Sequence, residues 1–436
     1  MVFSSIIFLF RFLPIFILCY FLAPKRMKNV ILFLGSLIFY AWGEPVHVFL
    51  MLFSTIVDYT LGRLIDANRG KPAAKVFLAT SVAVSLLLLG TFKRHIGISF
   101  YTFQTMSYII DVYRGEVKVQ KNLLDFGVFV SLFPQLIAGP IVKYKTVEDS
   151  LHDRPVDINK ISGGVKRFVT GLAKKVLIAD HAGELWEIIS VMDYGSMSVL
   201  SAWLGVLAFA FRIYFNLSGY SDMAIGLGEI LGFHFPENFH YPYLSASVTE
   251  FWDRWFISLG SWFREYVYNP LGGNRKDRKR QMMAILAAWA LIGLWHGAAV
   301  NYFIWGVWFA VFLILEKLFL GKALNGLPKL FRWVYTGLVV LFGWVIFFSE
   351  TMAGAWGYAK AMFNLNQGSV LDARGLYLGG EYLMLLVIAA VASTPVISGQ
   401  IQKLKSSHTG YAMAVYRLGE KVIPPVLLLL SIAYIV

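Results

Sequence analysis

The chain has 436 residues, of which 58% are hydrophobic, 16% aromatic and only 15% charged. A soluble domain carries about 45–50% apolar and about 25% charged residues, so this chain has too few polar side chains to cover a soluble globule of its size. The excess apolar surface requires lipid as its solvent. The composition therefore predicts an all-α polytopic membrane protein.

The formal net charge is +13, which on a soluble protein would suggest a nucleic-acid partner. Here most basic residues lie in short stretches between apolar runs, as in cytoplasmic membrane loops. We therefore expect a lipid bilayer as partner and no nucleic acid. The single cysteine, Cys19, excludes a disulfide or a cysteine-based metal site within one chain.

The first apolar segment, residues 2–22, is interpreted as a retained membrane helix, because Arg11 interrupts it and no small-residue cleavage site follows. Similar runs predict further helices at residues 29–42, 46–65, 76–92, 198–216, 219–233, 334–348, 383–396 and 422–436. A span needs about 20 residues, and we expect roughly ten to twelve helices in one domain over residues 1–436, without internal repeats.

Two segments differ from simple spans. Residues 97–113 mix aromatic side chains with hydroxyls and an amide, which fits either an interfacial aromatic belt or a helix that lines a polar cavity. Pro134, Gly139 and Pro140 follow the apolar residues 123–133. These residues cannot continue a regular helix, and broken backbone at membrane depth predicts a re-entrant loop.

The middle of the chain is more polar. From residue 161 to residue 176, apolar residues repeat at helical spacing with lysines and an arginine between them, which predicts a basic amphipathic helix on an anionic membrane face. Ser247 and Glu250 have the spacing of a capping box. The aromatic and charged segment that follows, to Tyr268, is expected at the interface or inside the bundle.

His296 lies in an almost unbroken apolar run, residues 282–315. Burial of an ionisable group in hydrocarbon is costly, so such a residue is a functional candidate. A neutral imidazole can act as general base when an alcohol attacks a thioester, or can carry the acyl group itself. The alternative is a core histidine that one hydrogen bond satisfies. His234 and His240 flank Pro236 and could line a cavity mouth.

Other reaction classes find little support. The sequence has no His-x-x-x-His pair, and Glu237 and His240 form a single Glu-x-x-His spacing without a second copy, so no metal is expected. There is no phosphate-binding glycine loop before a strand and no Gly-x-Ser-x-Gly nucleophile motif.

Five motifs occur in order along the chain. They are LIAGPI at residues 136–141, FNLSGYSDMA at 215–224, FWDRW at 251–255, YNPLGGNR at 268–275 and LWHG at 294–297. Together they resemble the membrane-bound O-acyltransferase (MBOAT) family, in its bacterial alginate O-acetylation branch. The resemblance implies a helical bundle with re-entrant and interfacial helices and a central funnel that ends at the histidine of the Trp-His-Gly motif, which is His296.

The same resemblance implies the function. It implies an O-acyltransferase, and we expect an O-acetyltransferase, that needs no cofactor and takes its acyl group from acyl-CoA or an acyl carrier protein. The acyl group would cross the bacterial cytoplasmic membrane toward a cell-surface polysaccharide. An extracytoplasmic SGNH-type acetyltransferase would be the partner.

We expect several residues to line the cavity or orient the substrates: Asn216, Asp222, Trp252, Arg254 and Trp295. A basic loop on the cytoplasmic side is expected to attract the anionic donor. It comprises Arg275, Lys276, Arg278, Lys279 and Arg280.

The chain departs from the family pattern at three places. Phe256 stands where relatives usually carry a second histidine, Val300 replaces a tryptophan, and the stretch before Gly97 is short. Because Phe256 replaces this histidine, an alternative function is that of a catalytically impaired scaffold that recruits an extracytoplasmic acyltransferase. The prolines near residue 134 would also fit another alternative, a proton-coupled transporter or flippase in which His296 relays protons.

Overall fold

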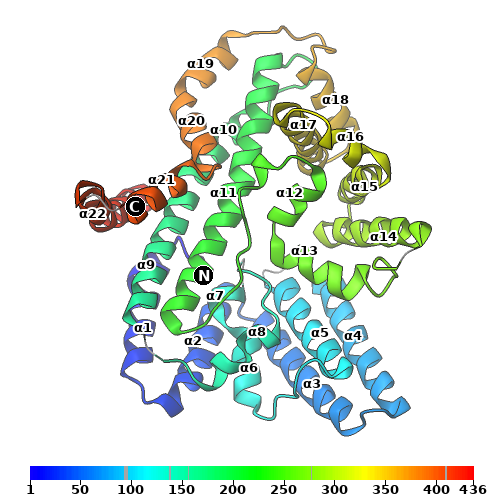
Figure 1. Ribbon diagram of the computed structural model, residues 1–436, viewed down its shortest axis with the longest axis vertical. Helices are drawn as coiled ribbons and strands as arrows, with labels where there is room; N and C mark the ends of the chain where they lie inside the picture. The colour runs from blue at the N-terminus through cyan, green and yellow to red at the C-terminus, as the bar shows by residue number, and fades with distance from the viewer. Residues whose placement is uncertain (93–96, 137–138, 156, 276, 408–409) are drawn as a thin grey trace. The chain divides into compact units, whose positions relative to one another are not determined.

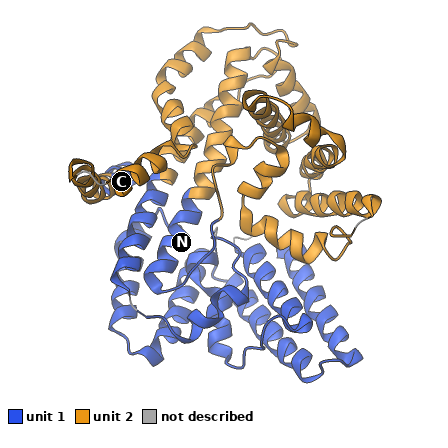
Figure 2. Cartoon of the chain, viewed as in Figure 1, with its two compact units in different colours: residues 1–173, 219–237, 427–436 blue, residues 174–218, 238–426 orange. Residues whose placement is uncertain are grey.

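The computed structural model describes residues 1–436 except 93–96, 137–138, 156, 276 and 408–409 (Figure 1). The described residues form helices and no β-strand, which confirms the predicted all-α class. They divide into two compact units (Figure 2). Unit 1 contains residues 1–173, 219–237 and 427–436, and unit 2 contains residues 174–218 and 238–426. The single domain expected from the sequence stays a prediction.

The described helices confirm a multi-pass membrane protein. Six are long and apolar enough to cross a bilayer: His47–Ala67, Pro72–Phe92, Val199–Leu231, Val300–Asn325, Lys329–Phe348 and Gly410–Ile435. A bent pair, Ala373–Glu381 and Leu383–Ala392, would supply a seventh span if it crosses as one unit. Phe8–Leu22 is a shorter apolar helix.

Unit 1 holds the N-terminal helices. Its elements are π-helical Phe8–Phe12, α1 (Leu13–Leu22), the 3-10 turn Lys25–Met27, α2 (Lys28–Gly43), α3 (His47–Ala67), α4 (Pro72–Phe92), α5 (Ile98–Arg114), α6 (Leu123–Ser131), α7 (Phe133–Leu136), α8 (Tyr144–His152), α9 (Ile158–Ala173) and residues 219–231 of α11 (Val199–Leu231).

The polar helix α5 lies inside unit 1. Tyr101, Thr102, Gln104 and Thr105 are at most 1% exposed. Side chains of an interfacial aromatic belt would contact lipid headgroups and would be accessible. The aromatic-belt alternative is therefore wrong, and the position inside the bundle is confirmed.

Broken backbone follows α6, as predicted. The chain turns after Ser131 and forms the short helix α7 (Phe133–Leu136), and residues 139–143, which include the buried Ile141 and Val142, are not helical. The Phe133 amide donates to Ser36 Oγ at 3.1 Å, and Gln135 Nε2 donates to the Phe129 carbonyl at 2.6 Å. Such contacts satisfy polar groups that a broken helix exposes. Residues 137–138 of the predicted loop lie outside the described part.

Two expectations about α9 and α11 need correction. Residues 199–231 form one helix, although the sequence predicted two segments separated near Gly219. The physical reason is close packing: a Cβ on Gly171 of α9 would lie 2.5 Å from the Gly219 carbonyl, and a Cβ on Gly164 would lie 2.5 Å from the Gly226 carbonyl. The helix predicted over residues 161–176 is confirmed in α9, but α9 ends at Ala173 and π-helical Lys174–Asp180 follows. Contact of its apolar face with a membrane stays a prediction.

Unit 2 holds the segment with His296. Its elements are π-helical Lys174–Asp180, α10 (His181–Ser190), residues 199–218 of α11, the 3-10 turn Pro242–Leu244, α12 (Val248–Arg254), α13 (Ile257–Phe263), π-helical Arg264–Tyr268, α14 (Arg278–His296), α15 (Val300–Leu315), π-helical Glu316–Leu320, α16 (Gly321–Asn325), α17 (Lys329–Phe348), α18 (Met352–Met362), α19 (Ala373–Glu381), α20 (Leu383–Ala392), α21 (Val396–Ser406) and residues 410–426 of α22 (Gly410–Ile435).

Candidate active site

His296 is the last residue of α14, immediately before a break at residues 297–299 that separates α14 from α15 (Figure 1). The split that the sequence predicted near Gly297 is confirmed. The two helices approach backbone to backbone: a Cβ on Gly293 would lie 2.3 Å from the Tyr302 carbonyl, and a Cβ on Gly306 would lie 2.3 Å from the Trp289 carbonyl.

The imidazole of His296 is half-buried among aromatic rings. Its centroid lies 5.0 Å from that of Trp305 and 5.3 Å from that of Phe347, with the ring planes nearly perpendicular to both. The neighbouring Trp295 ring is 4.6 Å away. Perpendicular aromatic contacts of this kind fix a ring in one orientation, and partial exposure leaves the imidazole within reach of substrate.

A cavity of about 900 Å³ lies within unit 2. Its apolar part is formed by Ile285, Ala288 and Ile292 of α14 together with Trp252 and Trp289. The basic side chains that line it are Arg264, Lys317, Lys322 and Arg332. His296 is not among the lining residues; the lining residue Trp252 packs against Trp305, with ring centroids 5.7 Å apart, and Trp305 contacts the imidazole.

The helix that carries Trp252 is held by a buried carboxylate that the sequence analysis missed. Glu316 accepts hydrogen bonds from the amides of Val248 and Thr249 at 2.7 and 2.9 Å, from Thr249 Oγ1 at 2.6 Å and from the Tyr335 hydroxyl at 3.2 Å. Helix N-termini leave amides without intrahelical acceptors, and Glu316 satisfies two of them from a segment that is distant in sequence.

The predicted capping box at the same helix is present in modified form. Ser247 Oγ accepts a hydrogen bond from the Glu250 amide at 3.0 Å, as predicted. Glu250 reaches back one residue further than the motif requires, to the Ala246 amide at 2.7 Å. Its other oxygen pairs with Arg254 at 2.6 Å.

The predicted cavity-lining residues divide between the two units. In unit 2, Trp252 lines the cavity, Trp295 contacts the His296 ring, and Arg254 pairs with the lining residue Glu250 but does not line the cavity itself. Asn216 is half-buried in α11, and its Oδ1 atom has no hydrogen-bond partner among the described residues. Their roles in substrate orientation stay predictions.

Asp222 belongs to unit 1 and is held by a residue that the sequence analysis did not select. Arg167 of α9 donates to Asp222 Oδ1 at 3.0 and 3.1 Å and to Glu237 at 2.6 Å. Burial alone would lower the pKa of the Arg167 guanidinium, but the hydrogen bonds and charges of Glu237 and Asp222 outweigh burial and raise that pKa. This ion-pair network ties α9 to α11, and substrate contact by Asp222 stays a prediction.

The predicted donor-attracting loop is only partly a loop. Arg278, Lys279 and Arg280 form the first turn of α14, Arg275 precedes it, and all four are exposed. Asp277 caps the helix by accepting from the Lys279 amide at 3.0 Å. Cations at a helix N-terminus oppose the helix dipole, so helix stability does not explain them. Lys276 lies outside the described residues.

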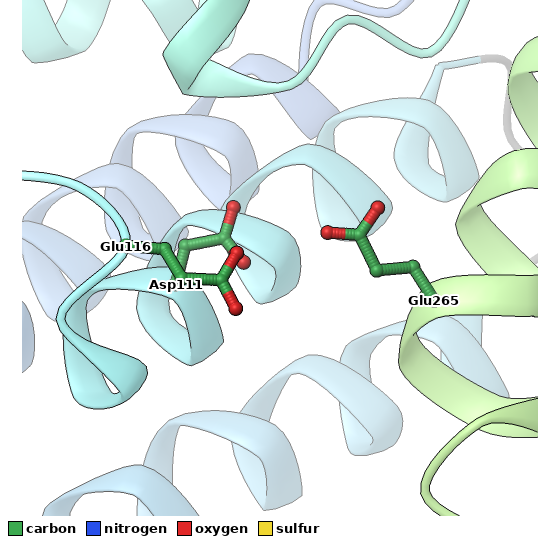
Figure 3. A group of neighbouring side chains, drawn as sticks. All are labelled: Asp111, Glu116 and Glu265. Atoms are coloured by element: carbon green, nitrogen blue, oxygen red, sulfur yellow. The ribbon is translucent and has the colours of Figure 1, made fainter. Parts of the chain in front are cut away.

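Two neighbouring carboxylates, Asp111 and Glu116, lie side by side in unit 1 (Figure 3). The Glu116 amide donates to the Asp111 carbonyl at 2.9 Å. Arg114 and Lys145 lie 3.8 and 3.9 Å from the Glu116 carboxylate. Because basic side chains balance this pair, we assign it no metal. Glu265, also labelled in Figure 3, belongs to unit 2.

Comparison with known proteins decides the family. Residues 114–349, more than half of the chain, match the model of the MBOAT, membrane-bound O-acyltransferase family. This region contains His296, the cavity and all of the predicted site residues. The chain belongs to the membrane-bound O-acyltransferase family. It is therefore a multi-pass membrane acyltransferase.

Individual relatives support the same assignment. The "Probable alginate O-acetylase AlgI" of Pseudomonas aeruginosa is 40% identical over 425 residues, covering 89% of this chain and 81% of the relative. The "Peptidoglycan O-acetyltransferase" of Helicobacter pylori is 29% identical and covers 84% of this chain and 80% of the relative. The "Teichoic acid D-alanyltransferase" of Bacillus subtilis is 28% identical over 58% of this chain and 68% of the relative.

Proposed function

We propose that this membrane-bound O-acyltransferase takes an acetyl group from a thioester donor and passes it across the membrane toward a cell-surface polysaccharide, with His296 as the reactive base. One observation carries the proposal: the half-buried imidazole is held among aromatic rings, and its neighbour Trp305 packs against Trp252, which lines a cavity that has four basic and three acidic side chains. The similarity to the alginate and peptidoglycan O-acetylating relatives supports acetyl as the transferred group.

The reaction needs one group that accepts and then returns a proton. His296 takes the proton of the acceptor hydroxyl while the hydroxyl oxygen attacks the thioester carbon. The carbon–oxygen bond forms, the carbon–sulfur bond breaks, and the imidazolium returns the proton to the departing thiolate. If His296 instead carries the acyl group itself, the same bonds exchange in two successive transfers.

The cavity suits a thioester donor such as acyl-CoA or an acyl carrier protein. Its basic side chains Lys317, Lys322 and Arg332 complement a phosphorylated arm, whereas Arg264 pairs with Asp253. Its apolar part beside Trp252 accommodates the acyl end. We place the cavity and the exposed residues Arg275, Arg278, Lys279 and Arg280 at the cytoplasmic face of a bacterial cytoplasmic membrane, because short loops rich in lysine and arginine favour that side.

The acceptor side completes the proposal. The relatives named above are acetylases or acyltransferases of alginate, peptidoglycan and teichoic acid, so a polysaccharide of the cell envelope is the acceptor class that we propose. An extracytoplasmic SGNH-type acetyltransferase would receive the acyl group and complete its transfer. No observation of the structure favours the transporter alternative.

The test is mass analysis of surface polysaccharide from cells that carry the wild-type gene, no gene, His296→Ala or His152→Ala. His152 is a matched control because its side chain is 59% exposed in unit 1. We expect acetylation to disappear without the gene and with His296→Ala, and to persist with His152→Ala, at equal amounts of protein in the membrane. Wild-type acetylation in the His296→Ala cells would refute the proposal.

A further inference from the structure

Two tryptophans beside the candidate active site bury a hydrogen-bond donor without using it. The indole Nε1 atoms of Trp252 and Trp305 are buried, and neither has a hydrogen-bond partner among the residues that the structure describes. Elsewhere in unit 2, Trp203 donates to the Met362 carbonyl and Trp308 to the Val339 carbonyl, both at 3.0 Å, whereas the buried Nε1 atom of Trp333 also has no partner among the described residues. A buried donor without an acceptor costs about 1–3 kcal/mol, so an acceptor from outside the chain would relieve that cost.

Both indoles lie between the cavity and His296, where they pack against each other. Trp252 lines the cavity, and its ring centroid lies 5.7 Å from that of Trp305 at an angle of 85°. Trp305 is 1% exposed, and its ring lies 5.0 Å from the imidazole. The two indoles therefore form a series of ring contacts between a cavity-lining side chain and the imidazole.

We propose that the indole N–H groups of Trp305 and Trp252 bind the carbonyl oxygen of the acyl donor, and that Trp305 stabilises the oxyanion that forms during transfer. This inference rests on the proposed function. When the acceptor hydroxyl oxygen bonds to the thioester carbon, the carbonyl electron pair moves to its oxygen, and the Trp305 N–H donates to that oxyanion. The pair returns as the carbon–sulfur bond breaks, and the thiolate takes the proton from His296.

The chemistry of indole suits this role. Its N–H donates and has no acceptor counterpart, so it favours an oxygen that gains negative charge. The Trp305 ring is fixed by Phe309 at 5.4 Å, Phe347 at 5.3 Å and Trp289 at 6.1 Å. Donors that are already oriented in a water-poor site stabilise a developing charge without reorganisation.

The decisive experiment removes the N–H and keeps the ring. Trp305 is replaced by benzothienylalanine, which has sulfur in place of the N–H, and in a second variant by phenylalanine (Trp305→Phe). Both are purified and assayed with acetyl-CoA, an alginate oligosaccharide and the extracytoplasmic SGNH-type partner. Because loss of one oxyanion donor lowers kcat about 10²–10³-fold, we expect at least a 100-fold fall in kcat with a KM for acetyl-CoA within threefold of wild type.

Matched variants separate this role from packing. Trp308→Phe removes an N–H that already bonds a backbone carbonyl, and we expect it to lower the melting temperature but to leave kcat within threefold. Trp252→Phe is expected to raise the KM for acetyl-CoA at least fivefold. Full kcat in the benzothienylalanine variant would overturn the inference while the proposed function stands. Activity of His296→Ala equal to wild type would instead overturn the proposed function.

Discussion

The imidazole of His296 meets the indole of Trp305 edge to face, with ring centroids 5.0 Å apart and ring planes at 84°. His296 is the last residue of α14, and Trp305 belongs to α15, which begins after the break at residues 297–299. The geometry of the pair therefore depends on how α14 and α15 cross. Any residue that sets this crossing also sets the position of the imidazole.

Gly293→Ala tests this dependence. A Cβ at residue 293 would lie 2.3 Å from the Tyr302 carbonyl and would force the two helices apart. We expect a loss of at least about 2 kcal/mol in the free energy of unfolding, as in other overpacked cores, and a fall in kcat of at least tenfold. Thermal unfolding and acetyl transfer by purified protein measure the two effects.

Gly337→Ala is the matched control for that variant. Gly337 lies within α17, and a Cβ at this position would meet no atom within 4 Å. Because alanine has a helix propensity about 1 kcal/mol better than glycine, we expect unchanged or slightly higher stability and unchanged kcat. Equal behaviour of the two alanine variants would show that the α14–α15 crossing does not position His296.

Asn301 is predicted to position Phe347 against the imidazole. It is 4% exposed, and its Nδ2 atom donates to the Ser349 carbonyl at 2.8 Å and weakly to that of Phe347 at 3.4 Å. Asn301→Ala releases the end of α17. We expect a loss of about 1–2 kcal/mol in stability together with at least a tenfold fall in kcat at little changed KM.

Asn366→Ala provides the comparison for Asn301→Ala. Asn366 donates to the carbonyls of Tyr194 and Met197 at 2.9 and 2.8 Å. Asn366→Ala therefore removes two side-chain-to-carbonyl hydrogen bonds, as Asn301→Ala does, at a position distant in sequence from His296. We expect a similar loss of stability with wild-type kcat. A proportional fall in kcat in both asparagine variants would indicate a general structural role only.

Local sequence patterns predicted the features that neighbouring residues determine. Hydropathy located the helices, the apolar run around His296 broke at Gly297 as expected, and Ser247 caps α12. Composition and the ordered motifs also indicated the family. These signals are readable because the interacting residues lie within a few positions of one another.

Contacts between distant residues could not be predicted in the same way. Glu316 caps an amide 68 residues away, and Asn301 bonds a carbonyl 48 residues away. Gly219 has the residue type of a helix break, and only its partner Gly171 on α9 shows that it serves close packing instead. Glu316 could have been noticed in the sequence as an acidic residue at the end of an apolar run, but that position does not identify the residues to which it bonds.

Glu316→Ala should disturb the cavity wall more than the chemistry. The carboxylate accepts hydrogen bonds from Val248, Thr249 and Tyr335 and is 8% exposed. Its removal leaves buried donors unsatisfied, at about 1–3 kcal/mol each, and frees the helix that carries Trp252. We expect a large fall in melting temperature and at least a fivefold rise in the KM for acetyl-CoA.

The comparison for Glu316→Ala is Glu187→Ala, because Glu187 is 69% exposed and pairs with Arg212 at the surface. Exposed ion pairs contribute about 0–1 kcal/mol, so this variant should resemble wild type in both measurements. An unchanged KM in Glu316→Ala at a temperature where the protein stays folded would contradict the role of Glu316 in the wall.

Phe256→His tests the departure from the family pattern. Phe256 has φ of 45° and stacks on Phe239 at 6.0 Å. Bulky residues rarely adopt this left-handed conformation, whereas histidine does so more readily. We expect the wild-type chain to transfer acetyl groups and Phe256→His to fold and to raise turnover severalfold. Turnover in Phe256→His alone, with none in wild type, would support the impaired-scaffold alternative.

Variants of Asp58 test how hydrogen bonds from neighbouring hydroxyls stabilise a carboxylate inside a membrane helix of unit 1. It is 2% exposed and accepts hydrogen bonds from Ser81 at 2.6 Å, from Ser54 at 3.4 Å and from the Thr105 hydroxyl. No ion pair to it occurs among the described residues. Asp58→Asn keeps an acceptor for these hydroxyls and should be mild. Asp58→Ala removes it, and we expect a loss of more than about 2 kcal/mol.

The control for Asp58→Ala lies two turns later on the same helix. Asp66 is 39% exposed and pairs with Arg69 at 3.0 Å, so Asp66→Ala removes an aspartate whose charge water already screens. Thermal unfolding of the three variants in one detergent should rank Asp66→Ala and Asp58→Asn near wild type and Asp58→Ala well below. Equal melting temperatures for both alanine variants would mean that the hydroxyl hydrogen bonds around Asp58 contribute no net stability to unit 1.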